Sequence, residues 1–455
     1  MDEMRCIRRG RGICRGGPGG EERNMNDMTF IATGDSFITR RIPEGGYEGQ
    51  HLLREIIGRH DVRFTNLEMT FHHMEGTPAA ESGGTWAMAD PRCLDDMRGY
   101  GFNLYTTANN HSGDYGEGGV LATIRHLQER DMIFSGTGRN LAEASRPCYL
   151  ETRKGRVALV SASSSFSAAS AAGPQSGEAP GRPGLNPLRV QTTYHVTRPY
   201  FDMVRELAAA TGINAMEDYA IRLGYLLPKQ ENVQALGQYR FVLDEENRVV
   251  SEPREKDMQR IETEIREAGR QADVVLVSIH AHEADYGDFS VPAGFLETFA
   301  RRCVDAGAAV VIGHGPHELR GIECYHGGLI FYSLGNFIFQ TETVSLQPGD
   351  AFAGKGLPPD TKVGEYMDQR SKNGTIGYPS MENIWRSVMA AWTMRDGKLS
   401  QVQLYPLSLR MGQKRTIRGT PVLAESDAVL RYLAELSRPY GTEIVIRDGI
   451  GYIDF

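Results

Sequence analysis

Residues 273–283, DVVLVSIHAHE, and residues 308–317, AAVVIGHGPH, decide the fold of this chain. Each begins with a nearly continuous run of apolar residues, which is typical of a strand buried on both faces of a parallel sheet. Between them, FLETFARRCVDAG at residues 295–307 has the apolar spacing of an amphipathic helix. The order strand–helix–strand therefore predicts an α/β sheet in which both strands lead into histidines.

The same alternation extends toward the N-terminus. The further strand-like runs are residues 28–35, 61–69, 102–111, 132–138 and 155–164. Amphipathic stretches typical of helices lie between most of them and again directly before residue 273. We therefore predict an α/β fold with a central β-sheet sandwich flanked by helices.

Three segments interrupt or flank this pattern. Residues 1–27 are basic and glycine-rich and lack the apolar core of a signal peptide, so we expect them to be disordered. Within a main domain at residues 28–340, residues 165–250 form an insert that begins with a Pro- and Gly-rich loop at 165–189. We expect a small helical and loop lid there. Residues 341–455 are expected to complete the sheet as a C-terminal extension.

Composition narrows the class of protein. The chain of 455 residues is 40% hydrophobic and 24% charged, which is ordinary for a globular protein. The formal net charge of -8 gives no general attraction to nucleic acid, and no run of about 18 apolar residues suggests a membrane span. The six cysteines are scattered without a CxxC pair and indicate reduced thiols in a cytoplasmic protein.

Polar side chains follow five of the strand-like runs at the point where each run ends. They are Asp35, Glu68, Asn110 with His111, His280 with His282, and His314 with His317. Because ligands bind at the carboxyl ends of the strands in open α/β sheets, we expect these groups to converge. Carboxylates, a carboxamide and imidazoles together suit Mn²⁺, Zn²⁺ or Fe²⁺. Two such ions would clamp a phosphoryl or acyl group and generate hydroxide near neutral pH.

Simpler explanations exist for single members of this set. Asp35 is also a residue type that caps helices, and Glu68 could be a solvated strand end. Either Asn109 or Asn110 could form a turn, and we expect one of the two to do so. Asn110 is the better candidate for a metal ligand. His282 or Glu283 could orient His280 through the free nitrogen of its ring.

Six motifs in chain order resemble those of the CapA family of poly-γ-glutamate capsule synthesis proteins. They are ATGDS at Asp35, TNLEM at Glu68, ANNHSGDYG at Asn110, SIHAHE at His280, GHGPH at His314 and FYSLGNF at residues 331–337. The resemblance covers roughly residues 28–340 and implies a β-sheet sandwich like that of the calcineurin-like metallophosphoesterases.

The resemblance also implies roles for these residues. Asp35, Glu68, Asn110, His280, His314 and His317 would be metal ligands, with Glu68 bridging two ions. His111 would be the outer acid that protonates a leaving group, and Asp35 and His317 would take part in catalysis with it. Two departures weaken one ion site: Phe37 stands where the phosphoesterase pattern has a histidine, and the closing pair reads HGPH instead of His-x-His. One ion, two ions or none are therefore all compatible with the sequence.

Three residues are candidates for substrate binding. Arg182 and Arg189 follow Pro- and Gly-rich sequence, and the planar guanidinium is a natural receptor for a carboxylate or phosphate. Most arginines in loops are simply solvated, so this role competes with a structural one. Glu283, directly after the second histidine of SIHAHE, is the third candidate.

Three functions follow from these observations. The first is a metal-dependent hydrolase that acts on an amide or phosphoester bond of an acidic, peptide or other small-molecule substrate, in poly-γ-glutamate or capsule metabolism. The second is a metal-independent acid/base enzyme, such as a peptide epimerase, in which Asp35 faces His314 or His317. The third is a non-catalytic partner in capsule assembly.

Overall fold

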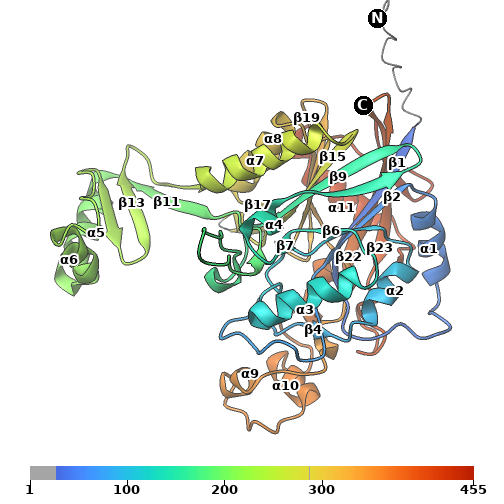
Figure 1. The fold of residues 1–455 in the computed structure, drawn as a ribbon, viewed down its shortest axis with the longest axis horizontal. Helices are drawn as coiled ribbons and strands as arrows, with labels where there is room; N and C mark the ends of the chain where they lie inside the picture. The colour runs from blue at the N-terminus through green and yellow to red at the C-terminus, as the bar shows by residue number, and fades with distance from the viewer. Residues whose placement is uncertain (1–26, 286, 455) are drawn as a thin grey trace, which may run out of the picture.

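Two β-sheets form the centre of the computed structural model, which describes residues 27–285 and 287–454 (Figure 1). The ten-stranded sheet runs β25-β26-β23-β22-β1-β2-β5-β6, with β21 beside β1 and β24 beside β23. Its strands are β1 (Met28–Phe37), β2 (Val62–Leu67), β5 (Leu104–Thr106), β6 (Phe134–Ser135), β21 (Asn336–Phe339), β22 (Arg386–Arg395), β23 (Lys398–Ser408), β24 (Val422–Leu423), β25 (Val445–Arg447) and β26 (Ile450–Asp454).

The second sheet has six strands in the order β19-β20-β18-β15-β9-β8. They are β8 (Cys148–Thr152), β9 (Gly155–Ser163), β15 (Val274–His280), β18 (Val310–His314), β19 (Leu319–Tyr325) and β20 (Gly328–Leu334). Strands β1 and β2 pair in parallel, with Asp35 opposite Asn66. Strands β15 and β18 also pair in parallel, with His280 opposite His314. The register of each sheet therefore brings polar side chains together at the strand ends.

The two sheets pack face to face. Phe30 and Ala32 of β1 and Phe64 of β2 belong to one buried apolar cluster with Leu276 of β15 and Ile312 of β18. Because successive side chains of a strand point to opposite faces, the neighbouring residues of these strands face outward, toward helices. The sandwich thus has one apolar core between its sheets and one on each outer face.

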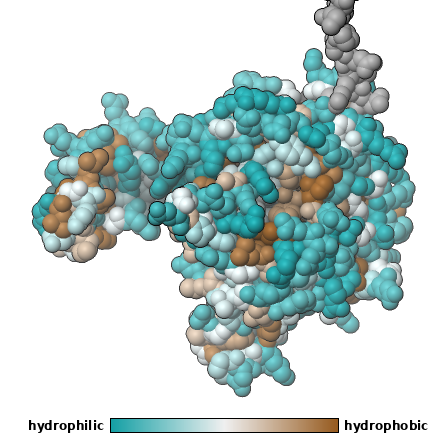
Figure 2. Space-filling view, in the orientation of Figure 1, coloured by the Kyte–Doolittle hydropathy of each residue, from teal (hydrophilic) through white to brown (hydrophobic). Residues whose placement is uncertain are grey.

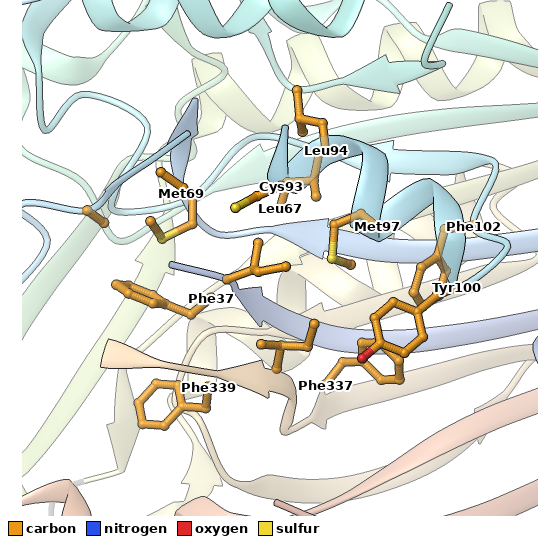
Figure 3. Close-up of a cluster of buried hydrophobic side chains, with 14 of the residues drawn as sticks. Phe37, Leu67, Met69, Cys93, Leu94, Met97, Tyr100, Phe102, Phe337 and Phe339 are labelled. Atoms are coloured by element: carbon orange, nitrogen blue, oxygen red, sulfur yellow. The ribbon is translucent and has the colours of Figure 1, made fainter. Parts of the chain in front are cut away.

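Helices cover both outer faces. The ten-stranded sheet is covered by α1 (Gln50–Gly58), α2 (Cys93–Gly99) and α3 (Gly116–Gln128), which contribute Leu53, Met97 and Leu127 to the core beside Ile31. Figure 3 shows part of this core, in which Phe37 lies near Phe339. The six-stranded sheet is covered by α7 (Glu255–Gly269) and α8 (Gly294–Asp305). The predicted α/β class is confirmed.

Residues 190–253 form an arm that projects from the sandwich (Figure 1). It contains a four-stranded sheet in the order β12-β13-β11-β14. Its elements are β11 (Val190–Val196), α5 (Arg198–Thr211), α6 (Ala215–Arg222), β12 (Val233–Leu236), β13 (Tyr239–Leu243) and β14 (Arg248–Pro253). Figure 2 shows apolar side chains on the arm, where Met216, Tyr225 and Leu227 are exposed. The expected insert of helices and loops therefore also contains strands, among them the sheet of the arm, which the sequence did not predict.

After β21 the chain leaves the sheet as residues 341–383, which we call the cover segment. It contains α9 (Gly349–Ala353) and α10 (Val363–Arg370) and returns to the sheet at β22. Strands β22 and β23 then form a hairpin that turns at Asp396 and Gly397, both with positive φ. The last helix is α11 (Ala428–Ser437), which contributes Leu430 to the core between the sheets.

The predictions for the N-terminal tail and for the cysteines can be compared with the structure only in part, because residues 1–26 lie outside the described residues. The expected disordered tail lies outside the described residues except for Asp27, whose carboxylate pairs with Arg395. Four described cysteines, Cys93, Cys148, Cys303 and Cys324, are free thiols. Within residues 27–285 and 287–454, no helix has the length and apolarity needed to cross a membrane.

Candidate metal centre

Asp35 lies at the end of β1, fully buried, where the two sheets meet. The chain reaches this point because Gly34 has no side chain: a Cβ there would lie 1.8 Å from the carbonyl oxygen of Gly335. One carboxylate oxygen of Asp35 accepts a hydrogen bond from Nδ2 of Asn66 at 2.7 Å. The other accepts one from the backbone N–H of Gly315 at 2.9 Å. Two neutral donors thus fix this carboxylate.

Asp35 faces histidines from the second sheet. Its Oδ1 lies 3.3 Å from Nδ1 of His314 and 3.7 Å from Nδ1 of His280, and its Oδ2 lies 3.6 Å from Nδ1 of His317. Burial acts to raise the pKa of Asp35, but contact with His314 and His317 holds that pKa well below its usual range. Asp35 is therefore an ionised carboxylate in the buried site.

Glu68 follows β2 and is equally buried, but it lacks the hydrogen bonds that fix Asp35. Neither of its carboxylate oxygens has a hydrogen-bond partner among the described residues. Its nearest polar groups are Nε2 of His280 at 3.7 Å, Nδ1 of His317 at 3.7 Å and Nε2 of His111 at 4.0 Å. Burial and the negative charges of Asp35 and Asp114 raise the pKa of Glu68 well above its ordinary value. A carboxylate in such a position is costly unless a cation accompanies it.

The histidines contact one another as well as the carboxylates. Nδ1 of His280 lies 3.0 Å from Nδ1 of His314, and Nε2 of His280 lies 3.1 Å from Nε2 of His282. Burial lowers the pKa of His280 far below its usual value and that of His282 to about 3. These imidazoles are therefore neutral near pH 7, and the neutral form is the one that binds a metal.

The carboxylates and imidazoles form three overlapping groups that could hold a metal ion. The groups are Asp35, His280 and His314; Glu68, His280 and His282; and Asp35, Glu68 and His317, and within each the donor atoms lie within 4.8 Å of one another. We call these six residues the polar cluster. His282 belongs to one of these groups, and Asn66 supports the polar cluster through its hydrogen bond to Asp35. The sequence did not predict either residue as part of the metal site, although the HAH and TNLE motifs contain them.

His111 and His317 lie at the edge of the polar cluster, each held through Nδ1. Nδ1 of His111 donates to Oδ2 of Asp114 at 2.7 Å. Asn336 donates from Nδ2 to the carbonyls of His317 and Ile384, so its Oδ1 accepts from Nδ1 of His317 at 2.9 Å. In both histidines, Nε2 is therefore left for substrate or a proton, while Nδ1 of His317 is the ring nitrogen that lies near Asp35 and Glu68.

The two asparagines of the ANNH motif have different environments. Nδ2 of Asn109 donates to Asn66 and to the carbonyl of Leu67, and its Oδ1 accepts from the backbone N–H of His111. Asn109 therefore shapes the turn. Nδ2 of Asn110 donates to the carbonyl of Gly83, whereas its buried Oδ1 has no partner among the described residues. That oxygen remains available for a ligand, and Asn110 is still a predicted one.

The three predicted substrate-binding residues lie apart from the polar cluster or support it. Nε of Arg182 donates to the carbonyl of Ala171 at 2.9 Å. The guanidinium of Arg189 pairs with Asp257 at 3.1 Å. The structure gives neither arginine a contact with the polar cluster. Glu283 accepts hydrogen bonds at 2.8 Å from Ser164 and Ser165, and Ser165 in turn accepts one from the backbone N–H of His282.

Two cavities adjoin the polar cluster. The first cavity, of about 270 Å³, is lined by Phe37, His111 and His317 together with residues of the cover segment. The second, of about 280 Å³, is lined by Asn110 and His282 and by Ser165–Ser167 of the Pro- and Gly-rich loop. Phe37 meets His111 edge-on at 5.1 Å between ring centroids. A phenyl ring at this position cannot ligate a metal, but it forms an apolar wall beside the candidate acid.

Known proteins resemble this chain over most of its length. A sequence model of the family described as "Bacterial capsule synthesis protein PGA_cap" matches residues 29–341. Uncharacterized protein y4sH of Sinorhizobium fredii is 33% identical over 94% of this chain and 93% of its own length. Capsule biosynthesis protein CapA of Bacillus anthracis is 27% identical over 70% of this chain and 61% of its own length. A solved structure of a hypothetical protein from Thermus thermophilus is 14% identical, covers 84% of this chain and 99% of its own, and has a TM-score of 0.39.

Proposed function

Because the chain belongs to the bacterial capsule synthesis protein family PGA_cap, we propose that it is a metal-dependent hydrolase with a role in capsule metabolism. Its target would be an amide or phosphoester bond in an acidic or peptide substrate. The observation that carries the proposal is Glu68, a buried carboxylate whose two oxygens have no hydrogen-bond partner among the described residues. Such a group is expected where a cation supplies the missing interaction.

The side chains around Glu68 fit a divalent metal of the Mn²⁺, Zn²⁺ or Fe²⁺ type. The polar cluster combines two carboxylates with four imidazoles, a nitrogen and oxygen donor set that suits these ions. When bound, such an ion polarises the bond to be cleaved and lowers the pKa of a coordinated water. His280 belongs to two of the three groups and Glu68 to two, so the same residues would serve one ion or a pair.

The chain's own residues supply the remaining chemistry. His111 is oriented by Asp114, and it lines the first cavity together with His317. Protonated at Nε2, His111 would donate a proton to the leaving group as its bond breaks. Asp114 would hold the ring in place through its hydrogen bond to Nδ1. Phe37 and the cover segment would exclude water from the side of His111 that faces the substrate.

Metal analysis of protein purified without chelator or metal-affinity resin tests the proposal. We expect one or two equivalents of a transition metal, with hydrolytic activity that EDTA abolishes and the same metal restores. Glu68→Gln should lose both metal and activity. Activity that resists EDTA in protein without stoichiometric metal would contradict the proposal, whereas metal binding without any turnover would favour a capsule-assembly partner.

A second candidate function rests on the geometry of His317. Its Nδ1 donates to Asn336 and lies 3.6 Å from Oδ2 of Asp35, so its Nε2 is free for proton exchange. An acid/base pair of this kind could remove and return an α-proton, as a peptide epimerase does. The two functions give opposite results in deuterated water: the epimerase incorporates deuterium at a substrate α-carbon without cleaving it, and EDTA has no effect.

A further inference from the structure

Helix α10 of the cover segment brings one cation to the first cavity. Met367 and Arg370 of this helix line the cavity, on the same cavity surface as His111 and His317. Nη1 of Arg370 donates a hydrogen bond to Oγ1 of the buried Thr85, which follows the Gly83–Gly84 turn. Arg370 and Thr85 therefore form a polar pair next to the candidate catalytic histidines.

The charge of Arg370 is not neutralised by the protein. Among the described residues, no carboxylate oxygen lies within 4.0 Å of its guanidinium nitrogens. Glu342, the acidic residue that lines the same cavity, already pairs with Arg415 and Arg418. A guanidinium has five N–H donors, so Arg370 keeps several of them for an anion.

The remainder of the cavity wall is largely apolar. Met367, Ile376, Pro379 and Met381 line it from the cover segment. Between them and the polar cluster lies Tyr378, whose ring meets that of His317 at 5.3 Å between centroids. Burial, with a smaller contribution from the charge of Glu68, raises the pKa of Tyr378 to about 12. The lining of the cavity thus combines His317 of the polar cluster, an apolar wall and the cation of Arg370.

We propose that Arg370 and Thr85 bind a carboxylate of the substrate, and that the apolar wall receives an apolar side chain next to it. This inference rests on the proposed function and names its substrate class: a peptide with a free carboxylate and an apolar residue, whose amide bond lies at the polar cluster. The guanidinium of Arg370, which has no carboxylate within 4.0 Å among the described residues, attracts the substrate anion to this end of the cavity. A planar guanidinium also orients a carboxylate through two parallel hydrogen bonds.

Binding of three synthetic dipeptides, measured by calorimetry on metal-loaded protein, tests the inference. The probes are glycyl-phenylalanine, its C-terminal amide and glycyl-glycine, so that the amide has no carboxylate. We expect the acid to bind at least about tenfold more tightly than the amide, since hydrogen bonds to charged groups are the stronger ones. We also expect the phenylalanine acid to bind more tightly than the glycine acid because the ring packs on the apolar wall.

Variants of Arg370 and Thr85 then show whether these residues cause the preference for the acid over the amide. Arg370→Met should bind acid and amide alike, and Thr85→Val should reduce the preference for the acid by a smaller factor. Lys362→Met removes an exposed cation of the same segment, outside the cavity, and should keep the preference. Equal binding of acid and amide to the wild type, including no binding of either, would overturn the inference. So would a preference that persists in Arg370→Met.

The outcome is separable from that of the proposed function. Acid-selective binding that depends on Arg370, without metal-dependent cleavage of any dipeptide, would support the inference and contradict hydrolysis. Metal-dependent cleavage at equal rates for acid and amide would support hydrolysis and overturn the inference.

Discussion

The polar cluster and the cover segment line the same cavity but hold their side chains differently. Residues of the polar cluster lie at the ends of strands whose positions are fixed by parallel pairing. The carboxylate of Asp35 is also fixed by two hydrogen bonds from protein donors. The cover segment has no strand between β21 and β22, and its Arg370 is tied to the rest of the protein by a hydrogen bond to Thr85. Rigid strand ends suit chemistry that tolerates little displacement, whereas short helices between strands can vary with the substrate.

The largest effect should come from the polar cluster. Glu68→Gln keeps the shape of the side chain but removes its charge, so metal affinity should fall by more than about 100-fold, since even a residue that only supports a ligand contributes about 10–100-fold. Metal content by mass spectrometry and EDTA-sensitive activity measure the loss. Arg370→Met, on the cover segment, is the matched control and should keep its metal. Metal loss in both variants would remove the distinction between the two regions.

A smaller effect should come from the support of His111. Asp114→Asn keeps a hydrogen-bond acceptor but removes the charge, so kcat should fall by about 10–100-fold while metal content is unchanged. Asp114 also accepts hydrogen bonds from the backbone N–H groups of Gly83 and Ala87, which calls for a check of folding by thermal unfolding. A fall in metal content in step with kcat would instead assign Asp114 to the metal site.

Protonation of Glu68 should be visible in the stability of metal-free protein. Because its pKa in the folded state is raised above the ordinary 4.5, the folded state holds a proton that the unfolded state has released. The free energy of unfolding should therefore fall as pH rises from about 4.5 through the folded pKa, by up to about 1.4 kcal/mol per pH unit.

The lowered pKa values of His280 and His282 act in the opposite sense and reduce stability below about pH 6.5. Both histidines are present in wild type and in Glu68→Gln, so the stability difference between the two proteins reports the Glu68 carboxylate together with its contact with His280. Urea unfolding in EDTA from pH 5 to 8 measures it. A difference that does not change with pH would show that Glu68 titrates normally.

The smallest effect should come from the two arginines of the Pro- and Gly-rich region. Arg189→Ala breaks a partly exposed ion pair with Asp257 and should cost less than about 1 kcal/mol. The KM of Arg182→Ala and of Arg189→Ala tests the predicted role of these arginines in substrate binding. We expect the rise in KM in each variant to be smaller than the rise caused by Arg370→Met. A larger rise in KM in either variant would move the anion receptor from the cover segment to the loop.

The sequence predicted the α/β class and the strand-end residues because each followed a long apolar run. Parallel pairing places Asp35 opposite Asn66 and His280 opposite His314, and the packing of the two sheets then brings together Asp35, Glu68, His280, His314 and His317. The strands of the arm were missed because they are only partly buried, so their apolar pattern is weak. The role that we propose for Arg370 could not be predicted because it depends on tertiary contact with Thr85, 285 residues earlier in the chain.

The close crossing of Gly34 and Gly335 has a consequence for how the protein is made. The backbone N–H of Asp35 donates to the carbonyl of Gly335, and its carboxylate accepts from Gly315 and Asn66. Both glycines lie about 280–300 residues later in the chain. A nascent chain on the ribosome therefore cannot close the cluster until nearly three quarters of it has been synthesised, and β1 also waits for β22. We expect metal to bind only after translation has passed these residues. Metal binding would then follow the synthesis of the residues that form the cluster.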